Sequence, residues 1–204
     1  MKLFAGVDVG GTTSTVAIGN ADRQVLSVSA QFETRATEGP QGTIAAIVSA
    51  TSECLKNIDA SPEELTHVGL STPGPATLDG VLLNSPNLDP KHWNNFPFRA
   101  ALEEGVRTLA KDASVAYIGD GQAAALGEFS IRSDGIAWDR VPVEQSSGDS
   151  LSSLFMVIVG TGLGGGEVRN GQAVRGKEGR AGHAGHIFLP DYAFRHEHDR
   201  KLVV

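Results

Sequence analysis

The sequence predicts an α/β protein in which helices pack against a mixed β-sheet. Short apolar or alternating runs, typical of strands, occur within residues 3–32, at 67–70 and at 114–118. Amphipathic spacing, with apolar residues three and four positions apart, occurs between them at residues 40–58 and 98–109. Three strands followed by alternating helices and strands predict a mixed sheet with flanking helices.

The first elements are expected to form an antiparallel meander. Residues 3–9 are a mostly apolar run that ends in a glycine turn, residues 14–18 form a second strand, and residues 24–32 alternate well enough for a third. The helix expected at residues 40–58 presents one apolar face, which consists of Ile44, Ile47, Val48, Thr51 and Leu55.

The middle of the chain continues this alternation. The strand at residues 67–70 enters the rigid turn STPGP, and a helix is expected at residues 98–109. The strand at residues 114–118 then stops at Asp120, which stands between two glycines immediately before an alanine-rich helix at residues 121–129. Helix capping alone would account for an aspartate at this position.

The last third of the chain begins a new pattern. The segment that precedes it is polar and without a sustained period, as expected of a linker or insertion. Strands are then expected at residues 154–159 and 165–169. We therefore expect a first lobe at residues 1–130, a linker at 131–153 and the beginning of a second lobe at 154–204.

Composition narrows the class of protein. The 204 residues are 40% hydrophobic and 20% charged, with a net charge of −7 that disfavours a nucleic-acid partner. Cys54 is the single cysteine, which excludes an internal disulfide and fits the reducing cytoplasm. The apolar runs are too short for a signal peptide or a membrane span. The expected protein is a cytoplasmic one without a membrane partner.

Two glycine clusters imitate well-known phosphate motifs. GTGLGG at residues 160–165 has the spacing of a dinucleotide fingerprint, but the following GEVRNGQAVRGKEG is unfit for the helix that this site requires. GQAVRGK at residues 171–177 imitates a P-loop, but Glu178 replaces the hydroxyl residue that meets magnesium.

A hairpin bend is a third way to bind phosphate. VDVGGT at residues 7–12 and VIVGTG at residues 157–162 both lead a buried strand into a glycine and threonine turn. Such turns expose backbone N–H groups to an anion, and Asp8 beside the first could hold Mg²⁺ through water. Each bend alone could be a plain tight turn, but two of the same design favour phosphate binding.

Four segments, taken together and in order, resemble the ROK group of repressors, open reading frames and sugar kinases. They are GVDVGGTTSTVAI, then GLSTPGPAT with SPNLDPKHW, then GDGQAAALGE, and finally VGTGLGGG through GKEGRAGHAGH. The resemblance covers residues 2–187. It implies the actin-like, ribonuclease H-like ATPase fold, with one complete lobe and the start of a second. It also implies a kinase that transfers phosphate from ATP to a hydroxyl of a hexose or N-acetylhexosamine.

The resemblance also implies roles for individual residues. Asp120 would be the catalytic base, and Asp8 would serve Mg²⁺. The phosphate-binding residues would be Asp8, Gly10, Gly11, Thr12, Thr13, Gly160, Thr161, Gly162 and Gly164. The sugar would meet Gly74, Asn87, Asp120, His183 and His186. Expected partners are ATP and a sugar, and lobes of this group commonly pair into homodimers.

Three departures from the family pattern bear on substrate and metal. Gly119 replaces the first asparagine of N-D-A-N, and His183 replaces the glutamate of A-G-E-x-G-H, so glucose is not a safe guess. His186 matches a position that binds structural Zn²⁺ in many members, but the cysteine cluster that completes that site is absent before Val204. The second lobe is also expected to be incomplete.

Two other functions are compatible with the resemblance. A non-catalytic sugar-binding or regulatory protein would explain the lost amide and glutamate. Asp8, Asp120 and the two glycine bends argue against it, because a pure binder needs no base. A transcriptional repressor is disfavoured, because the first bend begins too early for a preceding helix-turn-helix.

Overall fold

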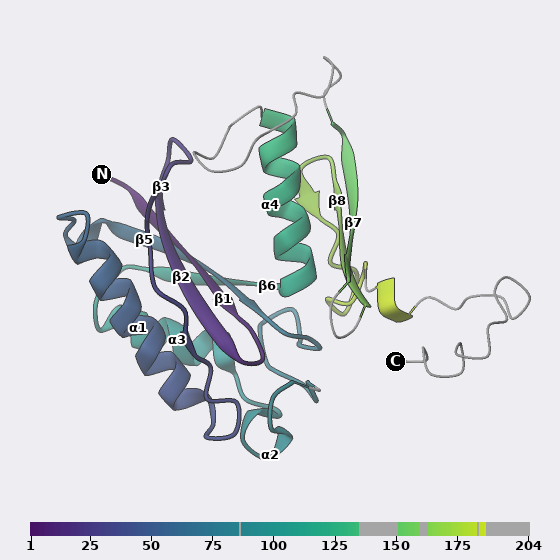
Figure 1. Cartoon of the computed structure of the whole chain (residues 1–204), viewed down its shortest axis with the longest axis horizontal. Coiled ribbons are helices and arrows are strands. Elements are labelled where there is room, and N and C mark those ends of the chain that lie inside the picture. Colours follow the sequence, from purple (N-terminus) through teal and green to yellow (C-terminus); the bar gives the residue numbers. More distant parts are fainter. Residues whose placement is uncertain (86, 135–150, 160–162, 183, 187–204) are drawn as a thin grey trace, which may run out of the picture. The chain divides into compact units, whose positions relative to one another are not determined.

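The computed structural model describes residues 1–85, 87–134, 151–159, 163–182 and 184–186 (Figure 1). The described residues divide into two compact units. One is Met1–Asp120, and the other comprises the described residues from Gly121 onward. Most of the expected linker at 131–153 lies outside the described residues, so the lobe boundaries remain a prediction.

The first unit is built on a six-stranded mixed sheet. Its strands are β1 (Leu3–Val9), β2 (Thr13–Asn20), β3 (Val25–Val28), β4 (Phe32–Glu33), β5 (Leu65–Thr72) and β6 (Ser114–Gly119). The order is β3-β2-β1-β5-β6, and β4 also pairs with β2. Pairings β1–β2 and β2–β3 are antiparallel, whereas β1–β5 and β5–β6 are parallel. The mixed sheet predicted from the element order is confirmed.

The third predicted strand is wrong in one respect. Residues 24–32 do not form one strand but two short ones, β3 and β4, which both pair with β2. The side chain of Ser29 lies between them. Its Oγ accepts a hydrogen bond from Val16 N at 3.0 Å, where a continuous ladder would supply a backbone carbonyl. Period-two alternation cannot reveal such a substitution of side chain for backbone.

Two helices pack on one face of this sheet, as Figure 1 shows. They are α1 (Pro40–Lys56) and α3 (Phe98–Arg107), and the shorter elements α2 (Pro90–Trp93) and η1 (Pro62–Glu64) flank them. Of the predicted apolar face of α1, three residues are buried and two half-buried. The helices approach closely because Gly105 has no side chain: a Cβ there would lie 3.0 Å from Ile44 Cγ2.

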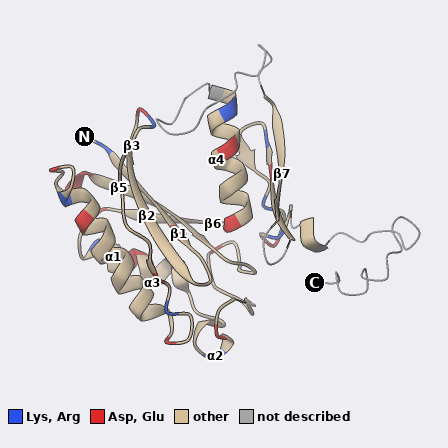
Figure 2. Cartoon of the chain, viewed as in Figure 1, with Lys and Arg blue, Asp and Glu red and all other residues tan. Residues whose placement is uncertain are grey.

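Alternation along β1 separates the core from an open face. Leu3, Ala5, Val7 and Val9 are each 4% exposed or less and belong to the core that α1 and α3 cover. Asp8 has the opposite parity and is exposed. It is the only Asp, Glu, Lys or Arg in β1, β2, β5 and β6, which Figure 2 shows as nearly free of charge. A lone charge among apolar strands indicates a function other than solubility.

The second unit combines one helix with a small antiparallel sheet. Helix α4 (Asp120–Asp134) begins where β6 ends and runs five residues beyond the predicted end at Phe129. The sheet has the order β7-β8-β9, with β7 (Ser153–Val159), β8 (Leu163–Arg169) and β9 (Gln172–Ala173), and the short helix η2 (Ala184–His186) follows. Ala125 and Phe129 of α4 form a core with Val168 of β8.

The secondary structure excludes both the dinucleotide fingerprint at residues 160–165 and the P-loop at residues 171–177. Strand β8 begins within GTGLGG, at Leu163, and continues to Arg169, so the helix required by a dinucleotide fingerprint does not follow. Residues 174–182 consist of turns and irregular segments instead of the helix that a P-loop requires. Within the described part of the chain, no helix is both long and apolar enough to cross a membrane.

Candidate phosphate and acceptor site

The first bend joins β1 to β2 as a tight hairpin. Gly10 N donates to Thr13 O at 2.9 Å. A Cβ on Gly10 would lie 2.7 Å from the same carbonyl oxygen, so glycine is required there. Thr12 and Thr13 are exposed, and Thr34 N donates to Thr12 O at 2.9 Å, which ties the bend to the segment before α1. The bend thus combines glycines with two exposed threonines, the residue types that an anion-binding turn needs.

The predicted sugar-side loop meets this bend. A Cβ on Gly11 would lie 2.8 Å from Asn87 Cβ, so Asn87 can pack this close to the bend only because Gly11 lacks a side chain. Asn87 is exposed, and Gly74 lies two residues beyond the end of β5 and is half-buried. The structure therefore places Gly74 and Asn87 at the edge of the sheet that carries the bend.

Asp8 lies two residues before Gly10, on the open face of the sheet. Its Oδ1 accepts a hydrogen bond from Ser71 Oγ at 2.7 Å. The fit to Mg²⁺ rests on chemistry: an exposed carboxylate suits an ion that keeps most of its waters and binds through one or two carboxylates.

Asp120 lies at the same edge of the sheet as Asp8. Strand register pairs Asp8 with Ser71 and Ser71 with Ile118, so these three residues form a row across β1, β5 and β6. Adjacent strands are about 4.8 Å apart, which puts β6 about 10 Å from β1, and Asp120 follows Ile118 by two residues. Asp120 is exposed and is the acid in the first turn of α4. Ligands of parallel sheets bind at this carboxyl edge.

Gly121, which follows Asp120, has a packing role within the second unit. A Cβ on Gly121 would lie 2.4 Å from Gly165 O, and one on Gly166 would lie 2.2 Å from Gly121 O. The first turn of α4 therefore touches the backbone of β8. Gly165 and Gly166 of the second glycine cluster form this contact. Gly164 lies in β8 opposite Ile158.

A buried glutamine reinforces the contact. Gln122 is 1% exposed, and its Nε2 lies within hydrogen-bonding distance of three carbonyl oxygens, those of Val174, Gly179 and Ala181, at 3.3, 3.3 and 3.0 Å. It connects the start of α4 to the loop that precedes η2.

Several predicted site residues are not placed. Gly160, Thr161, Gly162 and His183 lie outside the described residues, and only the backbone of His186, in η2, is described. Among the residues that the structure does describe, no group of three or more His, Cys, Asp or Glu side chains could hold a metal. The described side chains thus supply no ligand set that fits Zn²⁺.

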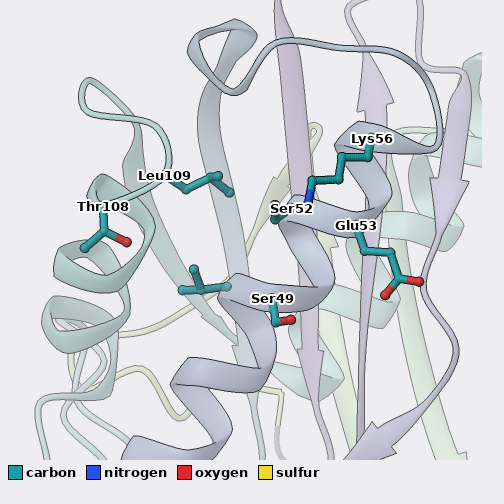
Figure 3. A pocket seen from close by; sticks show the side chains of 7 residues that line it. Ser49, Ser52, Glu53, Lys56, Thr108 and Leu109 are labelled. Atoms are coloured by element: carbon teal, nitrogen blue, oxygen red, sulfur yellow. The ribbon is translucent and has the colours of Figure 1, made fainter.

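Figure 3 shows a hollow on the helix side of the first unit. It lies between α1 and α3 and is lined by Val48, Ser49, Ser52, Glu53, Lys56, Thr108 and Leu109. Asp8 faces the other side of the sheet, so this hollow is separate from the candidate site.

Sequence reasoning missed Ser71 and Gln122. The signal for Ser71 was a hydroxyl at the end of a strand in GLSTPG, but its neighbour depends on the pairing of β5 with β1. For Gln122 the sequence holds no signal beyond a polar residue in an alanine-rich helix.

Comparison with known proteins identifies the family. Residues 4–198 match the profile of the ROK family. The chain belongs to the ROK family. It is 30% identical over 187 residues to a glucokinase from Halalkalibacterium halodurans, which spans 91% of this chain and 50% of that protein. It is 29% identical over 181 residues to an N-acetylmannosamine kinase from Vibrio cholerae, spanning 89% of this chain and 53% of that protein.

Solved structures agree. The ROK hexokinase from Thermus thermophilus matches with a TM-score of 0.71 and 28% identity over 92% of this chain and 54% of that one. A ROK family glucokinase from Streptomyces griseus, in complex with glucose and AMPPNP, matches with a TM-score of 0.65 and 25% identity over 92% and 51%. The predicted actin-like ATPase fold is confirmed, and the chain spans about half the length of these relatives.

Proposed function

We propose that the chain carries the acceptor and first phosphate sites of an ATP-dependent sugar kinase. The substrate class is a hexose or an N-acetylhexosamine. One observation carries the proposal: in a ROK family chain, Asp120 is exposed at the sheet edge that also holds Asp8 and the bend at Gly10. The kinase names of the relatives support the same reaction class.

The chemistry follows from the positions of these groups. Asp120 accepts the proton of a sugar hydroxyl while that oxygen attacks the γ-phosphorus of ATP. The new P–O bond forms as the bond between the γ-phosphorus and the bridging oxygen breaks, and ADP leaves. The N-terminus of α4 favours the ionised carboxylate of Asp120. Backbone amides of the first bend bind phosphate oxygens. When bound, Mg²⁺ neutralises phosphate charge, and Asp8 would hold it through water.

Gly119 bears on which sugar is used. It occupies the last position of β6 and offers no side chain where the family commonly has an asparagine. A sugar hydroxyl loses one amide partner, so the preferred sugar is expected to differ from those of relatives that keep it. We also propose a cytoplasmic location and assign no nucleic-acid or membrane partner. The homodimer implied by the family resemblance remains a prediction, which light scattering would test.

The test replaces Asp120 with asparagine. Glucose, N-acetylglucosamine and N-acetylmannosamine are screened for ADP release in the 204-residue chain. The same screen is run on a version lengthened with the carboxyl-terminal half of the Halalkalibacterium halodurans glucokinase. Asp120→Asn should lower kcat by at least about 100-fold while sugar binding, measured by calorimetry, changes little. Asp112→Asn is the control, because Asp112 is exposed at the opposite end of β6.

The results of this screen distinguish a catalytic role of Asp120 from a non-catalytic, sugar-binding protein. Undiminished turnover in Asp120→Asn would remove the base from the proposal. Sugar binding without ADP release in either version would favour the non-catalytic, sugar-binding alternative.

A further inference from the structure

Ser71 and Asp8 face each other across the parallel pair β1–β5. They are register partners, so their side chains leave the sheet on the same face. Ser71 Oγ donates to Asp8 Oδ1 at 2.7 Å. This length is normal for a well-formed hydroxyl hydrogen bond.

The hydroxyl of Ser71 has one proton and two acceptors in reach. Val7 O lies 3.4 Å from Ser71 Oγ, farther than the carboxylate, and it carries no charge. The proton therefore goes to Asp8. Ser71 is 6% exposed, so water does not readily replace its hydroxyl if the side chain is shortened.

No neighbour in β1 restrains the carboxylate of Asp8. The positions two residues before and two after it are Gly6 and Gly10, and a Cβ on Gly6 would have no atom within 4 Å. An exposed aspartate with glycines two positions before and after it ordinarily samples several rotamers. Ser71 supplies the restraint, and it occupies only one of the two carboxylate oxygens.

We propose that Ser71 is the positioning residue of Asp8. Its hydroxyl holds Oδ1 so that the second oxygen stays available, in a fixed orientation, to the hydration shell of Mg²⁺ beside the first bend. The inference rests on the proposed function, in which Asp8 serves Mg²⁺. Ser71 acts through Asp8 and touches neither nucleotide nor sugar.

Four variants of the chain separate this role from a structural one. Ser71→Ala removes the hydroxyl, Ser71→Thr keeps it, and Asp8→Asn removes the charge. Thr66→Val is the matched control, because Thr66 Oγ1 donates to Leu3 O at 3.2 Å between the same two strands, at their other end. Urea unfolding of all variants verifies that each is folded.

Two NMR measurements serve as readouts. Mn²⁺ is titrated in the presence of ATP, and it broadens the amide signals of residues 10–13 if a divalent ion binds beside the bend. The Mn²⁺ concentration at the midpoint of this broadening reports the affinity for the ion. Three-bond couplings of Asp8 report its χ1 rotamer. Ser71→Ala should raise the midpoint about ten-fold, the low end for outer partners of metal ligands, and average the couplings. Ser71→Thr and Thr66→Val should stay within about two-fold of the natural chain.

The outcomes distinguish the two proposals. If Asp8→Asn abolishes broadening but Ser71→Ala keeps the original midpoint, the role of Ser71 is overturned and that of Asp8 stands. If the Asp8 couplings average in Ser71→Ala while the Mn²⁺ midpoint stays unchanged, the role of Ser71 is also overturned, because the hydrogen bond to Asp8 would then be structural only. If Asp8→Asn changes nothing, or if the natural chain shows no broadening, the magnesium role of Asp8 fails, and the inference about Ser71 fails with it.

Discussion

Two glycines of the same helix should respond in opposite directions to replacement by alanine. Gly121 lies in the first turn of α4, and Gly127 lies farther along it. A Cβ at Gly121 would lie 2.4 Å from Gly165 O and 3.0 Å from its carbonyl carbon, both backbone atoms that cannot swing aside. A Cβ at Gly127 would have no atom within 4 Å.

The magnitude follows from these distances. A carbon and an oxygen normally stay about 3.2 Å apart, so Gly121→Ala must push α4 and β8 apart by most of an ångström. Overpacking of this kind costs about 1–3 kcal/mol, which the better helix propensity of alanine offsets by up to about 1 kcal/mol. Gly127→Ala has the better helix propensity of alanine without the cost of overpacking. We expect a loss of about 1–2 kcal/mol at Gly121 and a gain of about 0.5–1 kcal/mol at Gly127.

Urea and thermal unfolding, followed by circular dichroism, would measure both changes. For a chain of this size, 1 kcal/mol shifts Tm by about 2–4 °C, so the melting temperatures of the two variants should differ by several degrees. A Gly121→Ala variant as stable as Gly127→Ala would refute the close contact between α4 and β8. Equal losses in both would show that α4 tolerates no added methyl group, for a reason other than this contact.

Two further predictions concern polar side chains that have several interaction partners, Glu103 and Gln122. Glu103 accepts a hydrogen bond from Val115 N, and Arg107 and Arg99 are nearby, so its pKa is lowered from the ordinary value; burial opposes this shift. A lowered folded-state pKa stabilises the fold above the ordinary value, so the stability difference between the natural chain and Glu103→Gln should be full near neutral pH. It should shrink as pH falls below about 4.5 toward the folded-state pKa, and a pH-independent difference in urea unfolding would contradict the assignment. Gln122→Leu leaves three carbonyls without their shared donor and should cost about 2–3 kcal/mol. Amide hydrogen exchange at Ala181, whose N–H donates to Arg175 O at 3.2 Å, should speed up, and unchanged exchange would show that Gln122 does not hold the loop.

Local patterns were sufficient for most elements of the fold. Apolar alternation located β1 and β6, amphipathic spacing located α1 and α3, and the glycines after Val9 located the first bend, because each depends on a few adjacent residues. The pattern was wrong where a side chain replaced a backbone partner, at Ser29, and too short where α4 continued past Phe129.

The sequence by itself determined that strands lead into glycine bends and that Asp120 stands at a strand-to-helix junction. Only the tertiary structure decided what lies beside these features. The register of β1 with β5 brings Ser71 to Asp8 across 63 positions, and the packing of α4 on β8 explains why Gly121 has no side chain. Periodicity reports the face that a residue occupies, whereas the identity of its neighbour depends on chain pairing over long separations, which no local pattern contains.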